Sequence, residues 1–207
     1  MPRPLHKASL GLRVHCGWAS AIALAGPTDE PIVVSRERLE LSNAAFPGSD
    51  RPFQFVELMS LSEASAIIAR CWKYSFELAV AAIERLTRDL QQQGYDARTC
   101  GILQGRITEL PDLEKILAAH PNFYQMAATA EGVMFRELTQ IAAEASAMRV
   151  LKIPEFNLEE EAPGRLNLAP TELMPRLTSM GDALGSPWTI DQKYAACAAW
   201  LALLRRP

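Results

Sequence analysis

Apolar and polar positions alternate over the first third of the chain, which is the pattern of β-strands that bury one face. Segment 10–26 alternates and is rich in small and β-branched residues, so we interpret it as one strand with a bulge at Gly17. Segments 32–42 and 53–59 alternate in the same way, and turn-forming residues separate the three segments. This pattern predicts an antiparallel meander of three strands.

The pattern then changes to helical spacing over residues 61–93, where apolar residues recur every three to five positions. Ser60 and Glu63 form a capping-box sequence at the start, and Gly94 is a natural end. A helix of this length spans about 50 Å at 1.5 Å per residue. We therefore expect either a break near residues 72–74 or a far half that packs on a partner subunit.

Strands and helices alternate in the remainder of the chain. Short apolar strands are predicted at 97–105 and 149–156. Helices are predicted at 111–120, 121–148, 170–180 and 190–205. Residues 157–170 contain an acidic stretch with Pro and Gly, which we interpret as a solvated loop. Residues 1–8 are expected to form a flexible arm and residues 9–207 a single domain.

The order of elements predicts an α/β fold. The first three strands are neighbours in sequence and should pair antiparallel, whereas strands separated by helices should pair in parallel. The result is a mixed five-stranded sheet, an antiparallel three-strand meander plus two parallel strands, flanked by helices. This order resembles the ribonuclease-H-like superfamily. The early "AIAL" and the ending "DQKYAACAAWLAL" resemble the Holliday-junction-resolvase-type and actin-like branch.

The resemblance implies a site made of acids that hold one or two divalent metals, which activate water and stabilise the leaving oxygen. An acid is expected in the middle of the first strand, where this chain has His15 and Cys16. Another is often found at or after the fourth strand, where this chain has Gln104. Only Asp191, at the start of the last helix, matches in place. The sequence therefore favours a degenerate site.

Glu131, within the helical stretch "TAEGVMFREL", is a further acid to consider. The resemblance implies a divalent metal such as magnesium or manganese, and His15, Glu131 and Asp191 are the candidate metal ligands. A set that includes histidine suits manganese, iron or zinc better than magnesium. For catalysis the candidates are Asp191 and Glu131, with Lys193 to stabilise phosphate charge.

Each candidate also has a structural interpretation. Asp191 lies within a second capping-box sequence, residues 189–192, so it would favour the helix dipole without any other role. Lys193 opposes that dipole, which suggests a partner. His15 would be a half-buried, hydrogen-bonded strand residue. Gly132 costs about 1 kcal/mol relative to alanine inside a helix, so either function or close packing must explain it.

Backbone N–H groups before the last helix could bind an anion. The stretch "GDALGSPWT" is neither a Walker motif nor a dinucleotide fingerprint. The candidate cofactor-binding residues are Ser186 and Thr189, within this stretch, and Gly17, outside it.

The charge, cysteine spacing and hydrophobicity of the chain argue against several classes of function. A formal net charge of −3 and a pI near 5.7 do not support non-specific nucleic-acid binding, although a local basic groove stays open. The four cysteines have no metal-binding spacing, which indicates buried, reduced thiols. No apolar run reaches the roughly 18–20 residues of a membrane span, and no signal peptide is recognisable, so we expect a cytoplasmic protein without membrane contact.

Two functions remain open. The first is a ribonuclease-H-like protein that is non-catalytic or has a degenerate active site and acts in binding or self-association, as a homo-oligomer through helix 61–93. The alternative is a metal-dependent nuclease or phosphoryl-transfer enzyme with a rearranged site of His15, Glu131 and Asp191.

Overall fold

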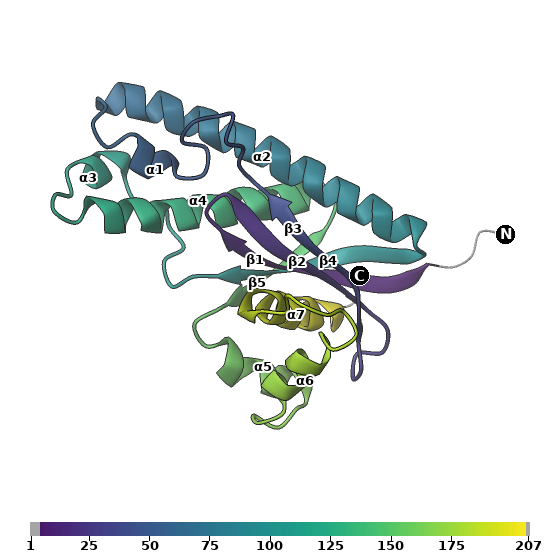
Figure 1. Cartoon of the computed structure of the whole chain (residues 1–207). Helices are drawn as coiled ribbons and strands as arrows, with labels where there is room; N and C mark the ends of the chain where they lie inside the picture. The colour runs from purple at the N-terminus through teal and green to yellow at the C-terminus, as the bar shows by residue number, and fades with distance from the viewer. Residues whose placement is uncertain (1–4, 206–207) are drawn as a thin grey trace.

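The computed structural model describes residues 5–205 and contains one five-stranded sheet between two layers of helices (Figure 1). The strands are β1 (His6–His15), β2 (Trp18–Ala25), β3 (Ile32–Glu40), β4 (Tyr95–Gln104) and β5 (Arg149–Pro154). Their order is β3-β2-β1-β4-β5, with β1, β2 and β3 antiparallel and β1, β4 and β5 parallel. The predicted fold class is confirmed.

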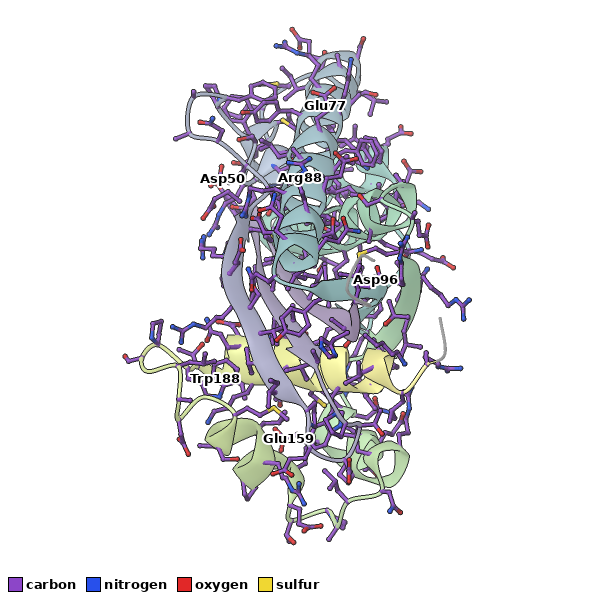
Figure 2. The ribbon with its side chains drawn as sticks, turned by 90° about the vertical axis from the view of Figure 1, so that its right-hand side faces the viewer. Asp50, Glu77, Arg88, Asp96, Glu159 and Trp188 are labelled. Carbon is purple, nitrogen blue, oxygen red and sulfur yellow. The ribbon has the colours of Figure 1, made fainter. Side chains whose placement is uncertain are left out.

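The helices are α1 (Pro52–Phe55), α2 (Leu61–Gln92), α3 (Leu113–Leu117), α4 (Phe123–Ala145), α5 (Leu158–Leu166), α6 (Leu173–Ser179) and α7 (Ile190–Leu203). Helices α2 and α4 cover one face of the sheet, and α7 crosses the other face with α5 and α6 beyond it (Figures 1 and 2). No helix among residues 5–205 is both long and apolar enough to cross a membrane.

The meander is present, but two of its three predicted segments are wrong. Segment 10–26 forms two strands, because the chain reverses at Gly17, whose φ of +77° suits glycine. Segment 53–59 is not a strand. Pro52 lies in the first turn of α1, where its missing N–H is harmless, and Phe53 and Val56 are buried one helical turn apart.

Residues 157–170 are not a loop, which is a second correction. Most of them form α5, whose Leu158, Ala162 and Leu166 are buried at helical spacing in the cluster that includes α7. The acidic run lies in the first turn of α5, where carboxylates favour the helix dipole.

The predicted arm 1–8 is also too long, because β1 begins at His6 and pairs with β4. Lys7 Nζ donates to the carbonyls of Leu203 and Arg205, which fixes this strand to the end of α7. Residues 1–4 of the predicted arm lie outside the described part of the chain.

Helix α2 confirms the long-helix prediction and its capping box. The Ser60 side chain accepts from the N–H of Glu63, and the Glu63 side chain accepts from the N–H of Ser60. The helix is continuous through residues 72–74, so the predicted break is wrong. Its buried stripe packs on α1, α3, α4 and the sheet of the same chain, so that stripe needs no partner subunit.

Helix α7 lies directly on the sheet because glycines and a serine face it. A Cβ on Gly11 of β1 would lie 1.9 Å from the carbonyl oxygen of Ala195, and one on Gly101 of β4 would lie 2.2 Å from that of Ala198. Ser9 Oγ donates to the carbonyl of Ala199 at 2.7 Å. This close approach holds the start of α7 beside the carboxyl end of β1.

Candidate functional site

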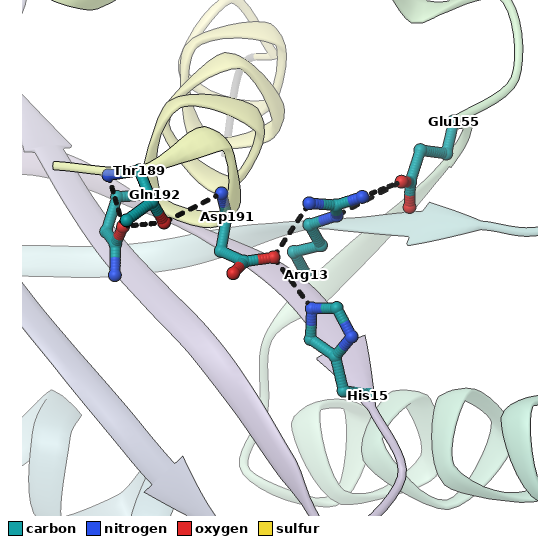
Figure 3. Close-up of polar contacts among 6 residues, drawn as sticks. All are labelled: Arg13, His15, Glu155, Thr189, Asp191 and Gln192. Carbon is teal, nitrogen blue, oxygen red and sulfur yellow. Dashed lines mark hydrogen bonds and ion pairs between the residues drawn. The ribbon is translucent and has the colours of Figure 1, made fainter.

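Asp191 joins a polar network at the carboxyl end of β1 (Figure 3). Its Oδ1 accepts a hydrogen bond from Arg13 Nη1 at 2.7 Å and lies 2.8 Å from Nε2 of His15. Arg13 also donates through Nη2 and Nε to Oε1 of Glu155, at 2.6 and 3.0 Å. Glu155 directly follows β5, so three segments far apart in sequence contribute to this cluster of Arg13, His15, Glu155 and Asp191, which we call the Arg13 network.

The helix start next to this network is capped by other residues. The Thr189 side chain accepts from the N–H of Asp191 at 3.3 Å, and the Gln192 side chain accepts from the N–H of Thr189 at 2.8 Å. The predicted capping box is confirmed. Because Thr189 and Gln192 supply the cap, the Asp191 carboxylate is left to bind Arg13 and His15 (Figure 3).

Aromatic rings pack against the side chains of Arg13 and His15 in β1. The Arg13 guanidinium lies 5.0 Å from the ring centroid of Tyr194, and the His15 ring stacks on Trp18 at 4.3 Å. Burial, followed by the hydrogen bond to Glu159, raises the pKa of Tyr194 to about 12. The Arg13 side chain is 18% exposed, so its ion pairs are partly shielded from solvent.

These residues do not fit the divalent metal site that the fold implies. The guanidinium of Arg13 forms ion pairs with the carboxylates of both Glu155 and Asp191, so these two acids already have a cationic partner. Gln104, which ends β4, is an amide where the resemblance implies a carboxylate, and its Nε2 makes no hydrogen bond to the Arg13 network. Among residues 5–205, no group of three or more His, Cys, Asp or Glu side chains is placed to hold a metal ion.

Glu131 is engaged with α1 rather than with His15 and Asp191. It is 1% exposed, and its two oxygens accept from the backbone N–H and from Nε2 of Gln54, at 3.0 and 3.1 Å. Burial raises the pKa of this carboxyl to about 7, against the opposing effects of the Gln54 bonds and the Arg51 charge. The structure thus brings together two of the three predicted metal ligands.

The other predicted site residues lie near the edge of the network or outside it. Lys193 is half-buried in the first turn of α7. Ser186 is exposed, and its neighbours Gly185 and Pro187 present carbonyls that accept from Arg36, each at 2.8 Å. Gly17 shapes the β1–β2 hairpin. Their catalytic and cofactor-binding roles stay predictions.

The cysteines are unpaired, as the sequence indicates. Burial raises the pKa of the Cys100 and Cys197 thiols to about 12. Burial, with a further contribution from the Glu131 charge, also raises the pKa of the Cys16 thiol to about 11. All three are therefore poor nucleophiles at neutral pH.

Sequence analysis missed Arg13 and Glu155. Arg13 alternates with His15 on the polar face of β1, and Glu155 follows the residue that ends β5. Because the carboxyl ends of parallel strands meet at one edge of a sheet, the position of Glu155 was a usable signal. Arg13 is a cation, so it does not belong to a pattern of metal-binding acids.

No family model matches this chain, and no curated protein matches it. Solved structures do match. RuvC from Thermus thermophilus in complex with a Holliday junction substrate is 9% identical, with a TM-score of 0.55, over 95% of this chain and 92% of that chain. A second Thermus thermophilus RuvC structure gives 9% identity and a TM-score of 0.51, over 94% and 92%. The predicted resemblance is confirmed at the level of the fold, which is ribonuclease-H-like.

Proposed function

We propose that this chain is a ribonuclease-H-like protein with a degenerate site that does not carry out divalent-metal nuclease chemistry and acts in binding or self-association. The ion pairs of Arg13 with Asp191 and Glu155 carry this proposal. An arginine side chain stays protonated at every physiological pH, so its charge is permanent. It neutralises two carboxylates and repels a dication from the space between them.

The alternative is a nuclease that uses His15, Glu131 and Asp191 around a metal. For that chemistry Arg13 would have to leave Asp191, and Glu131 would have to leave Gln54. The first movement leaves the half-buried Asp191 carboxylate without its arginine, and the second leaves the buried Glu131 carboxyl without its hydrogen bonds. Both are unfavourable. The observed contacts therefore favour the non-catalytic proposal.

The purified protein is expected to leave a four-way DNA junction intact in millimolar Mg²⁺ or Mn²⁺, and neither ion should raise its melting temperature. Arg13→Ser removes the guanidinium between two carboxylates, so Mn²⁺ at about 100 times its Kd should then raise the melting temperature by several degrees. Thermal unfolding and gel electrophoresis measure the two outcomes.

Arg98→Ser, which removes an exposed arginine paired with Asp96, is the matched control and should gain no Mn²⁺ response. Metal-dependent cleavage by the unmodified protein that disappears in both Asp191→Asn and Glu131→Gln would establish the alternative.

A half-buried apolar ridge on α2 supports self-association. Ile68, Trp72, Phe76 and Val80 follow one another at four-residue spacing, which places them on one ridge of the helix. The rings of Trp72 and Phe76 stack with centroids 5.3 Å apart. The ridge flanks the fully buried stripe and keeps partial solvent contact, so a second copy of α2 could cover it.

Sedimentation velocity is expected to show a dimer that dissociates when Trp72→Glu and Phe76→Glu are combined, because two charges then face the partner helix. Circular dichroism should show that the variant stays helical. Ala81→Glu adds a charge at an exposed position of the same helix and should leave the dimer intact. A monomer at every concentration of the unmodified protein would refute self-association.

A further inference from the structure

A polar cavity lies on the α4 face of the sheet, opposite the Arg13 network. Its volume is about 330 Å³, and its lining includes Gln104 at the end of β4 and Lys152 in β5. Residues that carry charged or hydrogen-bonding groups line most of it: Gln104, Thr108, Arg136, Glu137, Gln140 and Lys152. This volume is within the range of small-molecule sites.

Two glycines make room for the guanidinium of Arg136 in this cavity. A Cβ on Gly132, one turn earlier in α4, would lie 3.2 Å from Nη1, and a Cβ on Gly105, just after β4, would lie 3.0 Å from Nη2. The guanidinium therefore lies close to both backbones. This contact accounts for Gly132, which sequence analysis left open between function and packing.

Among residues 5–205, no carboxylate makes an ion pair with the half-buried Arg136. Its hydrogen bond is to the carbonyl of Ile107, at a long 3.4 Å, and none of the ion pairs among residues 5–205 includes it. Burial lowers the pKa of Arg136. The charge of Glu155 raises this pKa, but Glu155 already binds Arg13 through its Oε1. A partly desolvated cation without a partner is unfavourable unless a ligand supplies the negative charge.

Gln104 also lines this cavity, and its side chain has an unsatisfied donor. Its Nε2 is buried and has no hydrogen-bond acceptor among the described residues. Lys152 lines the cavity from β5, so three donors come from three different elements. A tetrahedral phosphate has an oxygen for each of them, whereas a carboxylate has only two.

We propose that this cavity binds the phosphate group of a small, hydroxyl-bearing phosphate monoester. Arg136 carries the main interaction, with Gln104 and Lys152 completing the phosphate site. Glu137 and Gln140 supply acceptor oxygens for the hydroxyl groups of the ligand. The inference does not depend on whether the Arg13 network is catalytic, because the two sites share no lining residue.

Titration calorimetry of the full chain with ribose 5-phosphate, inorganic phosphate and ribose tests the proposal. The two phosphates should bind, ribose 5-phosphate more tightly, and ribose should not. Arg136→Gln should weaken phosphate binding by roughly tenfold to a hundredfold, as expected for a charged hydrogen bond. Arg88→Gln, at an exposed position on α2 (Figure 2), should bind like the unmodified protein.

Gly132→Ala separates binding from folding. The added Cβ displaces the guanidinium, so phosphate affinity should fall, while the better helix former raises the melting temperature of the ligand-free protein. Lack of binding by both phosphates would overturn the proposal. Unchanged phosphate affinity in Arg136→Gln and Gly132→Ala, or binding of a single-stranded oligonucleotide alone, would overturn it as well.

Discussion

Replacement of Gly11 by alanine is expected to lower the free energy of unfolding by about 3 kcal/mol or more. The new Cβ would lie 1.9 Å from the carbonyl oxygen of Ala195 and 2.3 Å from the amide nitrogen of Ala199. Both atoms belong to the α7 backbone, which cannot move aside as a flexible side chain can. Helix α7 would have to lift from β1, which opens the core cluster on that face.

Gly164→Ala is the matched control, because nothing lies within 4 Å of a Cβ at that helical position. It should stabilise the protein by roughly 0.5–1 kcal/mol, since alanine loses less backbone entropy than glycine. Urea unfolding followed by circular dichroism measures both variants. An unchanged urea midpoint in Gly11→Ala would mean that α7 does not lie on β1 as described.

The local signals in the sequence were sufficient to predict helices α2 and α7. Both capping boxes and the regular apolar spacing of α2 depend on residues within a few positions of each other, so no tertiary information is needed. The β1–β2 hairpin was missed because alternation continues across Gly17. Segment 53–59 was misassigned because a short apolar run suits a strand as well as a helix. The burial of Phe53 and Val56, three residues apart, is helical spacing.

The candidate site was only partly predictable, because its contacts are long-range. Asp191 was found from its place at the start of the last helix. Its partner Arg13 is 178 residues away in sequence, and Arg13 is 142 residues from Glu155. Composition and residue spacing do not show which carboxylates form ion pairs with an arginine at the edge of a sheet. Glu131 was singled out as a candidate ligand, but its contact with Gln54, 77 residues away, appears only in the structure.

Glu131→Gln is expected to remove a pH dependence of stability that the unmodified protein shows between about pH 4.5 and pH 7. The pKa of Glu131 is raised from 4.5 to about 7 in the folded protein, chiefly by burial. In this pH range the unfolded chain has released the proton and the folded chain still holds it. Stability therefore falls as the pH rises, until both states are ionised.

The loss is about 3 kcal/mol, because each pKa unit corresponds to about 1.4 kcal/mol. Glutamine is neutral and of similar shape, and the amide of Gln54 can rotate to keep a hydrogen bond with it. Urea unfolding at pH 5 and pH 8 should show similar stabilities for both proteins at pH 5 and a more stable variant at pH 8. Glu144→Gln, at an exposed position of the same helix, should follow the unmodified protein at both pH values. If the free energies of unfolding of Glu131→Gln and the unmodified protein changed in parallel between pH 5 and pH 8, Glu131 would be ionised in the folded state over that whole range.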